Sequence, residues 1–184
     1  MSQPRHLPAT SIGRLAALPA GLAAVALVVA GCATNGPAAT PPIVPGRSDA
    51  PREVNLIARD YAFVPSTLDL VPGETILLHV VDAGLETHEA VIGDGLVQAA
   101  WEAAEATTVG APPGPTPLVR VPPDVAGVRV VVHSGERLDL AWTVPADAAE
   151  ATGAGGAWLV GCHIPGHWAK GMQIPIRWVT TGTP

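Results

Sequence analysis

The sequence predicts an all-β fold, a Greek-key β-sandwich, from its composition, its short apolar runs and the turn residues between them. Of its 184 residues, 20 are Gly and 20 are Pro, and only 14% are charged. Such a chain has many turns and few of the long polar faces that surface helices need. A hydrophobic content of 48% is enough for one domain with a packed core.

Eight apolar runs of strand length follow one another along the chain. They cover residues 54–58, 67–71, 75–81, 89–92, 128–133, 137–144, 157–161 and 174–179. Turn residues separate them, among them Pro72-Gly73 and Gly93-Asp94-Gly95. We therefore expect seven or eight strands within a single domain that covers residues 53–181.

An insertion interrupts this pattern between the fourth and fifth strands, at about residues 96–127. Its first part, residues 96–107, is rich in Ala and Glu and predicts a helix of about three turns. Residues 110–123 contain six Pro and must be irregular. We expect a helix and a loop that lie across the sandwich.

The N-terminus carries a targeting pattern. Residues 1–14 contain Arg5 and Arg14 but no acid, residues 15–30 are almost entirely Leu, Ala and Val, and Cys32 follows Val29-Ala30-Gly31. This order is typical of a signal peptide, and its end resembles a bacterial lipobox, which implies lipidation of Cys32 after removal of residues 1–31. The alternative, an uncleaved anchor helix, is short for a bilayer that needs about 20 apolar residues.

Residues 32–52 then read as a Pro- and Ala-rich tether without periodic apolar positions. We expect an exported lipoprotein that is anchored to a membrane and faces the periplasm or the outside of the cell.

The second cysteine, Cys162, has no obvious partner if Cys32 is lipidated. A disulfide between the two is the alternative in an oxidising compartment. Otherwise an exported lone thiol is exposed to oxidation unless it has a use such as metal binding.

A metal-binding pattern surrounds this cysteine. Cys162, His167 and Met172 are spaced as C-x4-H-x4-M, and a thiolate, imidazoles and a distant thioether are the ligands of a blue-copper site. A turn at Ile164-Pro165-Gly166 and a bend at Gly171 would let one loop supply three ligands. His88, at the start of an apolar strand, is the best candidate for the second imidazole.

Other residues compete for these roles. His163 neighbours Cys162, but the alternation of side chains along a strand turns it away from the metal. His79 and His133 fall in expected strands and fit structural or exposed positions. Taken singly, a buried Cys or Met is more often core filling than a ligand.

The loop from Cys162 to Met172 and the segments Asp60–Ser66, Val71–Thr75 and Thr87–Asp94 together resemble the plastocyanin/azurin (cupredoxin) family, particularly its periplasmic copper-binding members. The resemblance covers roughly residues 53–181. It implies an eight-stranded Greek-key sandwich, one type 1 copper ion and one-electron transfer, with the ligands at His88, Cys162, His167 and Met172. Ala90 departs from the family, which often has an aromatic residue there, and the insertion is long.

The resemblance also implies a docking patch around the histidine edge, which we place at Ile164, Pro165 and Trp168. The partner would be a redox protein such as a cytochrome or an oxidase, with this chain acting as a monomer. A nucleic-acid partner is excluded by a net charge of −6.

The leading function is that of a type 1 (blue) copper protein that carries single electrons between redox partners outside the cytoplasm. The alternative is copper binding, buffering or delivery in copper homeostasis. We expect no enzyme, because the sequence has no His-x-His pair for a second copper site and only one Cys in the loop.

Overall fold

The structure is a computed structural model that describes residues 42–110, 119–150 and 155–180. Within those ranges it has nine strands, one α-helix and two short 3-10 helices. The strands are β1 (Arg52–Arg59), β2 (Ala62–Val64), β3 (Leu68–Leu70), β4 (Thr75–Asp82), β5 (His88–Gly93), β6 (Val128–Val132), β7 (Arg137–Thr143), β8 (Leu159–Gly161) and β9 (Gln173–Trp178). The helices are α1 (Gly95–Ala106), η1 (Pro123–Val125) and η2 (Trp168–Lys170).

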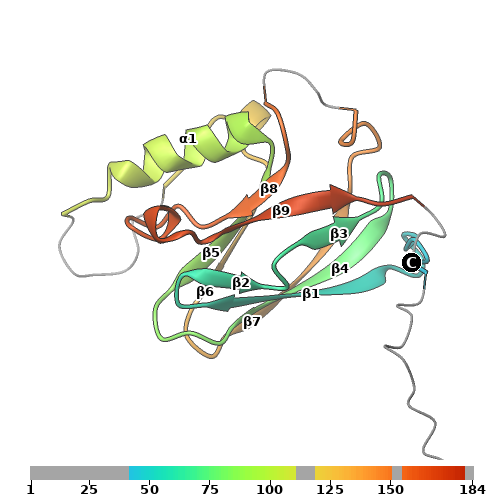
Figure 1. Ribbon diagram of the computed structural model, residues 1–184, viewed down its shortest axis with the longest axis horizontal. Helices are drawn as coiled ribbons and strands as arrows, with labels where there is room; N and C mark the ends of the chain where they lie inside the picture. Colours follow the sequence, from blue (N-terminus) through green and yellow to red (C-terminus); the bar gives the residue numbers. More distant parts are fainter. Residues whose placement is uncertain (1–41, 111–118, 151–154, 181–184) are drawn as a thin grey trace, which may run out of the picture. The chain divides into compact units, whose positions relative to one another are not determined.

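The strands form two mixed sheets. One sheet has the order β2-β1-β4-β7, and the other has the order β3-β9-β8-β5-β6. Figure 1 shows α1 beside the five-stranded sheet. The pairs β1–β4 and β3–β9 are parallel, and all the other pairs are antiparallel. One core cluster takes buried apolar side chains from both sheets. The predicted all-β sandwich is confirmed.

The core follows from the alternation of side chains along each strand, because successive residues point to opposite faces. In β1, Val54, Leu56 and Ala58 are buried in the core cluster, while Glu53 before them and Asn55 between them are exposed. The apolar residue at every second position therefore determines which face of the sheet is turned inward.

Strand β5 differs, because all six of its residues are buried. Ala90 and Ile92 belong to the main core, whereas Val91 packs against Val97 and Trp101 of α1 on the opposite face. The helix thus covers the outer face of the strand that begins with His88. This explains a strand that is buried throughout.

The helix predicted at residues 96–107 is confirmed, with its observed start and end one residue earlier. It begins where Asp94 accepts hydrogen bonds from the N–H groups of Leu96 and Val97, both at 3.1 Å. An N-terminal cap of this kind satisfies N–H groups that have no partner within the helix.

One strand was not predicted. Strand β2 has three residues and pairs with the end of β1 across the turn at Asp60 and Tyr61. Three residues are too few to show a period of two, so its pairing is set by the turn. Strands β3 and β8 are also shorter than the apolar runs that predicted them.

The predicted signal peptide, Cys32 and the first part of the tether lie outside the described residues. In the described part of the chain, no helix has the length and apolar character needed to cross a membrane.

Candidate metal centre

The four predicted ligands come from two places in the fold. His88 is the first residue of β5, and it is buried. Cys162 follows directly after β8, His167 precedes η2, and Met172 precedes β9. Because β5 and β8 are hydrogen-bonded neighbours, the end of β8 brings the loop against β5.

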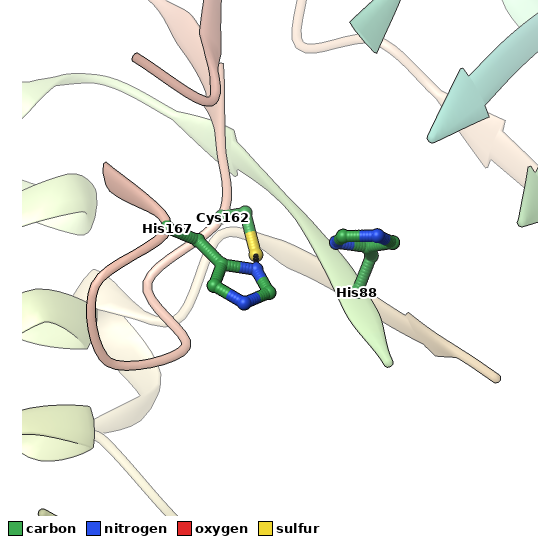
Figure 2. Close-up of side chains that lie close together, drawn as sticks. All are labelled: His88, Cys162 and His167. Carbon is green, nitrogen blue, oxygen red and sulfur yellow. Dashed lines mark hydrogen bonds between the residues drawn. The ribbon is translucent and has the colours of Figure 1, made fainter. Parts of the chain in front are cut away.

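The structure brings three of these residues into one cluster. Ligand atoms of His88, Cys162 and His167 all lie within 4.8 Å of one another. The Sγ atom of Cys162 is 3.3 Å from Nδ1 of His167, and the two imidazole centroids are 5.1 Å apart. Figure 2 shows the three side chains turned toward one another, one from a strand and two from the loop. All three are buried, with exposed fractions of 0%, 0% and 4% respectively.

Met172, the fourth predicted ligand, is held beside the cluster by its backbone. Its carbonyl accepts a hydrogen bond from the N–H of Cys162 at 3.0 Å, and its N–H donates to the carbonyl of His167 at 3.2 Å. The side chain is fully buried. The thioether therefore belongs to the same buried region as the thiol.

The loop takes this course because two glycines adopt backbone angles that other residues rarely reach. Gly166 has φ +89° and Gly171 has φ +92°, both in the left-handed region that favours glycine. The N–H of His167 closes the first turn on the carbonyl of Ile164 at 2.9 Å. Both predicted bends are therefore present.

The chemistry of the cluster fits a metal ion. Nδ1 of His88 is buried and has no hydrogen-bond partner among the described residues. An unpaired buried nitrogen costs free energy, and that cost is removed if the nitrogen binds a cation. One sulfur and two imidazole nitrogens suit Cu(I), Cu(II) or Zn²⁺.

Burial sets the charge of the cluster. It raises the pKa of the Cys162 thiol to about 12 and lowers the pKa of His167, which a hydrogen bond to Glu86 partly offsets. Near neutral pH the thiol is therefore protonated and can donate to Nδ1 of His167. Binding of a cation must release this proton.

The outer nitrogen of each imidazole meets a carboxylate that sequence reasoning missed. Nε2 of His88 is 3.3 Å from Oδ1 of Asp60, and Nε2 of His167 is 3.0 Å from Oε2 of Glu86. Asp60 lies in the turn after β1, in the other sheet, so no spacing along the chain relates it to His88. Gly84 leaves room for this contact, because a Cβ there would collide with both Asp60 and Nε2 of His88.

The structure places His163 outside the cluster. Its Nδ1 lies 2.8 Å from Oε2 of Glu102 and its Nε2 lies 2.8 Å from Oε1 of Gln98, both on α1. Its ring stacks on Trp168 at a centroid distance of 4.6 Å. Since both nitrogens have partners on the helix, His163 faces away from Cys162, as strand alternation predicts.

The residues predicted to form the docking patch, and the two other histidines, lie outside the cluster. Pro165 is exposed, Ile164 packs partly against the core, and Trp168 is half-buried against His163. Their docking role stays a prediction. His79 pairs with Asp139 and His133 pairs with Thr87, so neither lies in the cluster.

Comparison with known proteins identifies the fold of this chain. No family model and no curated protein sequence matches this chain. Among solved structures, dithionite-reduced auracyanin from the photosynthetic bacterium Roseiflexus castenholzii is 19% identical with a TM-score of 0.52, over 73% of this chain and 100% of that chain. Auracyanin B is 21% identical with a TM-score of 0.52, over 77% of this chain and 96% of that chain. At these identities the likeness shows a shared fold.

Proposed function

We propose that this protein, whose fold is that of the cupredoxins, binds one copper ion through His88, Cys162 and His167, with Met172 as a weaker ligand. We further propose that it carries single electrons between redox partners. The observation that carries the proposal is the buried convergence of two imidazoles and one thiol within 4.8 Å.

The donor set supports copper over other metals. Two imidazoles and a thiolate with a distant thioether make up the blue-copper electron-transfer site, whereas closed zinc sites have four strong ligands. Bound copper supplies a one-electron couple between Cu(I) and Cu(II). The protein's task is then to hold the same donors in place for both oxidation states.

The loop is suited to that task, because its backbone is fixed independently of any metal. Hydrogen bonds from Cys162 to Met172 and from Met172 to His167 connect three of the proposed ligands. β8 and β9 hold both ends of the loop in one sheet. Fixed ligands keep the rearrangement during electron transfer small, which favours fast exchange.

The site is tested by adding Cu(II) to the metal-free protein and recording the visible spectrum. The wild type is expected to develop an intense band with one copper per chain, and Cys162→Ser is expected to lack it. His163→Gln is the matched control, since it alters the neighbouring residue outside the cluster. A wild type without the band, or a Cys162→Ser variant that keeps it, contradicts the proposal.

Electron carriage is separated from copper delivery by two rate measurements on the loaded protein. A carrier is expected to exchange electrons with a redox protein such as a cytochrome in stopped-flow experiments and to retain copper through many cycles. Rapid transfer of Cu(I) to a chelator, with slow electron exchange, would instead identify a delivery protein.

We also propose that the domain works outside the cytoplasm, tethered by a lipid on Cys32. The support is the order of charged, apolar and small residues in residues 1–32. Mass spectrometry of the mature chain from membranes is expected to find a lipidated Cys32 as its first residue. A full-length chain with an unmodified Cys32 would refute the anchor but leave the copper site standing.

A further inference from the structure

Each imidazole of the cluster has a carboxylate at its outer nitrogen, Nε2. The inner nitrogen of His167 lies 3.3 Å from Sγ of Cys162, and its outer nitrogen lies 3.0 Å from the carboxylate of Glu86. In His88, Nε2 lies 3.3 Å from Asp60, and the buried Nδ1 has no hydrogen-bond partner within the described part of the chain.

Glu86 is held in place although half of its side chain is exposed. The hydroxyl of Tyr61 donates to its second carboxylate oxygen at 2.6 Å. The Tyr61 ring in turn packs nearly perpendicular to the His167 ring at a centroid distance of 5.2 Å, and the Lys170 ammonium lies 3.4 Å from the centre of the Tyr61 ring. Tyr61, Glu86 and Lys170 thus form a cap over His167, whose side chain is only 5% exposed.

Asp60 is fixed by the backbone of the loop that follows β4. Its Oδ1 accepts the N–H of Leu85 at 2.9 Å and that of Glu86 at 3.4 Å. Gly84 allows this approach, since a Cβ there would lie 2.4 Å from the same oxygen. One loop of five residues therefore places both carboxylates behind the two imidazoles.

These contacts differ from ordinary surface ion pairs, which contribute little because both partners are solvated. Here each carboxylate contacts an imidazole ring that is almost wholly buried. A carboxylate behind a metal-binding imidazole fixes which nitrogen carries the proton and makes the other nitrogen a stronger donor.

We propose that Glu86 and Asp60 are positioning residues that fix both imidazoles with Nδ1 toward the metal and favour Cu(II) over Cu(I), so that they lower the reduction potential. Glu86 has the greater effect, because its hydrogen bond is shorter and the Tyr61 hydroxyl orients it. The inference rests on the proposed copper function. Its structural half, the orientation of the rings, concerns the chain alone.

The electronic half is tested by the reduction potential of the copper-loaded protein. Glu86→Gln keeps a hydrogen-bond acceptor but removes the charge, and it is expected to shift the equilibrium about tenfold toward Cu(I), which raises the potential by about 59 mV for one electron. Asp139→Asn is the matched control, because it makes the same change beside His79, which is outside the cluster. Its potential should equal that of the wild type.

Two further variants keep this test decisive. Tyr61→Phe removes only the hydroxyl that orients Glu86, and it should raise the potential by less than Glu86→Gln does. Asp60→Asn should also raise it. Unchanged potentials in Glu86→Gln and Tyr61→Phe, or equal shifts in Asp139→Asn, would overturn the electronic half.

The structural half is tested without copper by ¹⁵N NMR of the histidine rings in the metal-free protein. In the wild type His167 is expected to carry its proton on Nε2, and in Glu86→Ala both tautomers should appear. A proton on Nδ1 in the wild type, or no change in Glu86→Ala, would overturn the inference. If the wild type bound no copper but showed the expected tautomer, the proposed function would fail while the positioning by Glu86 stood.

Discussion

Two adjacent residues in the loop from Cys162 to Met172 have opposite environments. Cys162 is in the core cluster between the sheets, whereas His163 lies against Gln98 and Glu102 of α1. Strand alternation continues for two residues past the end of β8 and separates the two side chains. A histidine next to the thiol is therefore unavailable to it, and one five residues away is within reach.

This separation predicts different outcomes for the two loop histidines. His167→Gln should abolish the intense visible band, because it removes a nitrogen 3.3 Å from Sγ of Cys162. His163→Gln should keep the band and one bound copper per chain. Spectra recorded during titration with Cu(II) check both, and loss of the band in His163→Gln would mean that the ligands are assigned wrongly.

Met172 makes a second prediction at this scale. Met172→Leu conserves volume in a fully buried position, so it should cost less than about 1.5 kcal/mol of unfolding free energy. It should also raise the reduction potential, because fewer donor atoms then stabilise the more highly charged Cu(II). Urea denaturation and voltammetry measure the two effects.

The control for this variant is Ile174→Val, a nearby core change expected to cost about 0.5–1.5 kcal/mol without moving the potential. If Met172→Leu left the potential unchanged, Met172 would be core filling and not a ligand.

At the scale of elements, helix α1 is tied to the metal region by a buried network of charges. Arg129 on β6 donates to Glu89 at 2.6 Å and to Glu105 of α1 at 2.7 Å, and its guanidinium lies over the Trp101 ring. Glu89 also accepts the N–H of His163 at 2.9 Å. The insertion therefore braces the strand and the loop that carry the proposed ligands.

This network predicts how stability depends on pH. Burial, and then repulsion from Glu89, raise the pKa of Glu105 above its ordinary value of 4.5, although Arg129 opposes the shift. A raised pKa in the folded state means that Glu105 contributes its stability below about pH 4.5, and this contribution is lost as pH rises through the folded pKa. The stability of the wild type relative to Glu105→Gln should therefore fall as the pH rises above about 4.5.

Urea denaturation at several pH values measures this difference, with the exposed acid Glu150 changed to Gln as the control. A constant difference in unfolding free energy between wild type and Glu105→Gln across the range would show that burial does not raise the pKa of Glu105.

Across the whole molecule, the two sheets divide the work of building the site. The strands that border the ligands belong to the five-stranded sheet, whereas Asp60 and Tyr61 come from the turn between β1 and β2 in the other sheet. The outer contacts of the cluster therefore form only when the sandwich closes. Metal binding should accordingly stabilise the folded domain as a whole.

Copper is therefore expected to raise the free energy of unfolding. At free Cu(II) a thousandfold above the dissociation constant, mass action adds about 4 kcal/mol if the unfolded chain does not bind. Calorimetry should record a higher Tm for the wild type and little change for Cys162→Ser. An equal rise in both proteins would point to binding elsewhere on the chain.

The sequence alone determined the fold class, the helix in the insertion and the set of residues that could form the site. These features have local signals: a period of two in the strands, Ala- and Glu-rich residues in the helix, and the spacing of Cys162, His167 and Met172 in one loop. His88 could be selected because it begins an apolar strand. Strand β2, with three residues, had no such signal.

Only the tertiary structure decided which groups stand behind these residues. Asp60 and Glu86 are polar residues in turns, where the identity of a side chain says little about what it meets. Their partners are 28 and 81 residues away along the chain, and contacts over such separations depend on how two sheets close on each other. Local patterns can place a side chain on a face or in a loop, but only the packed fold determines what lies on its other side.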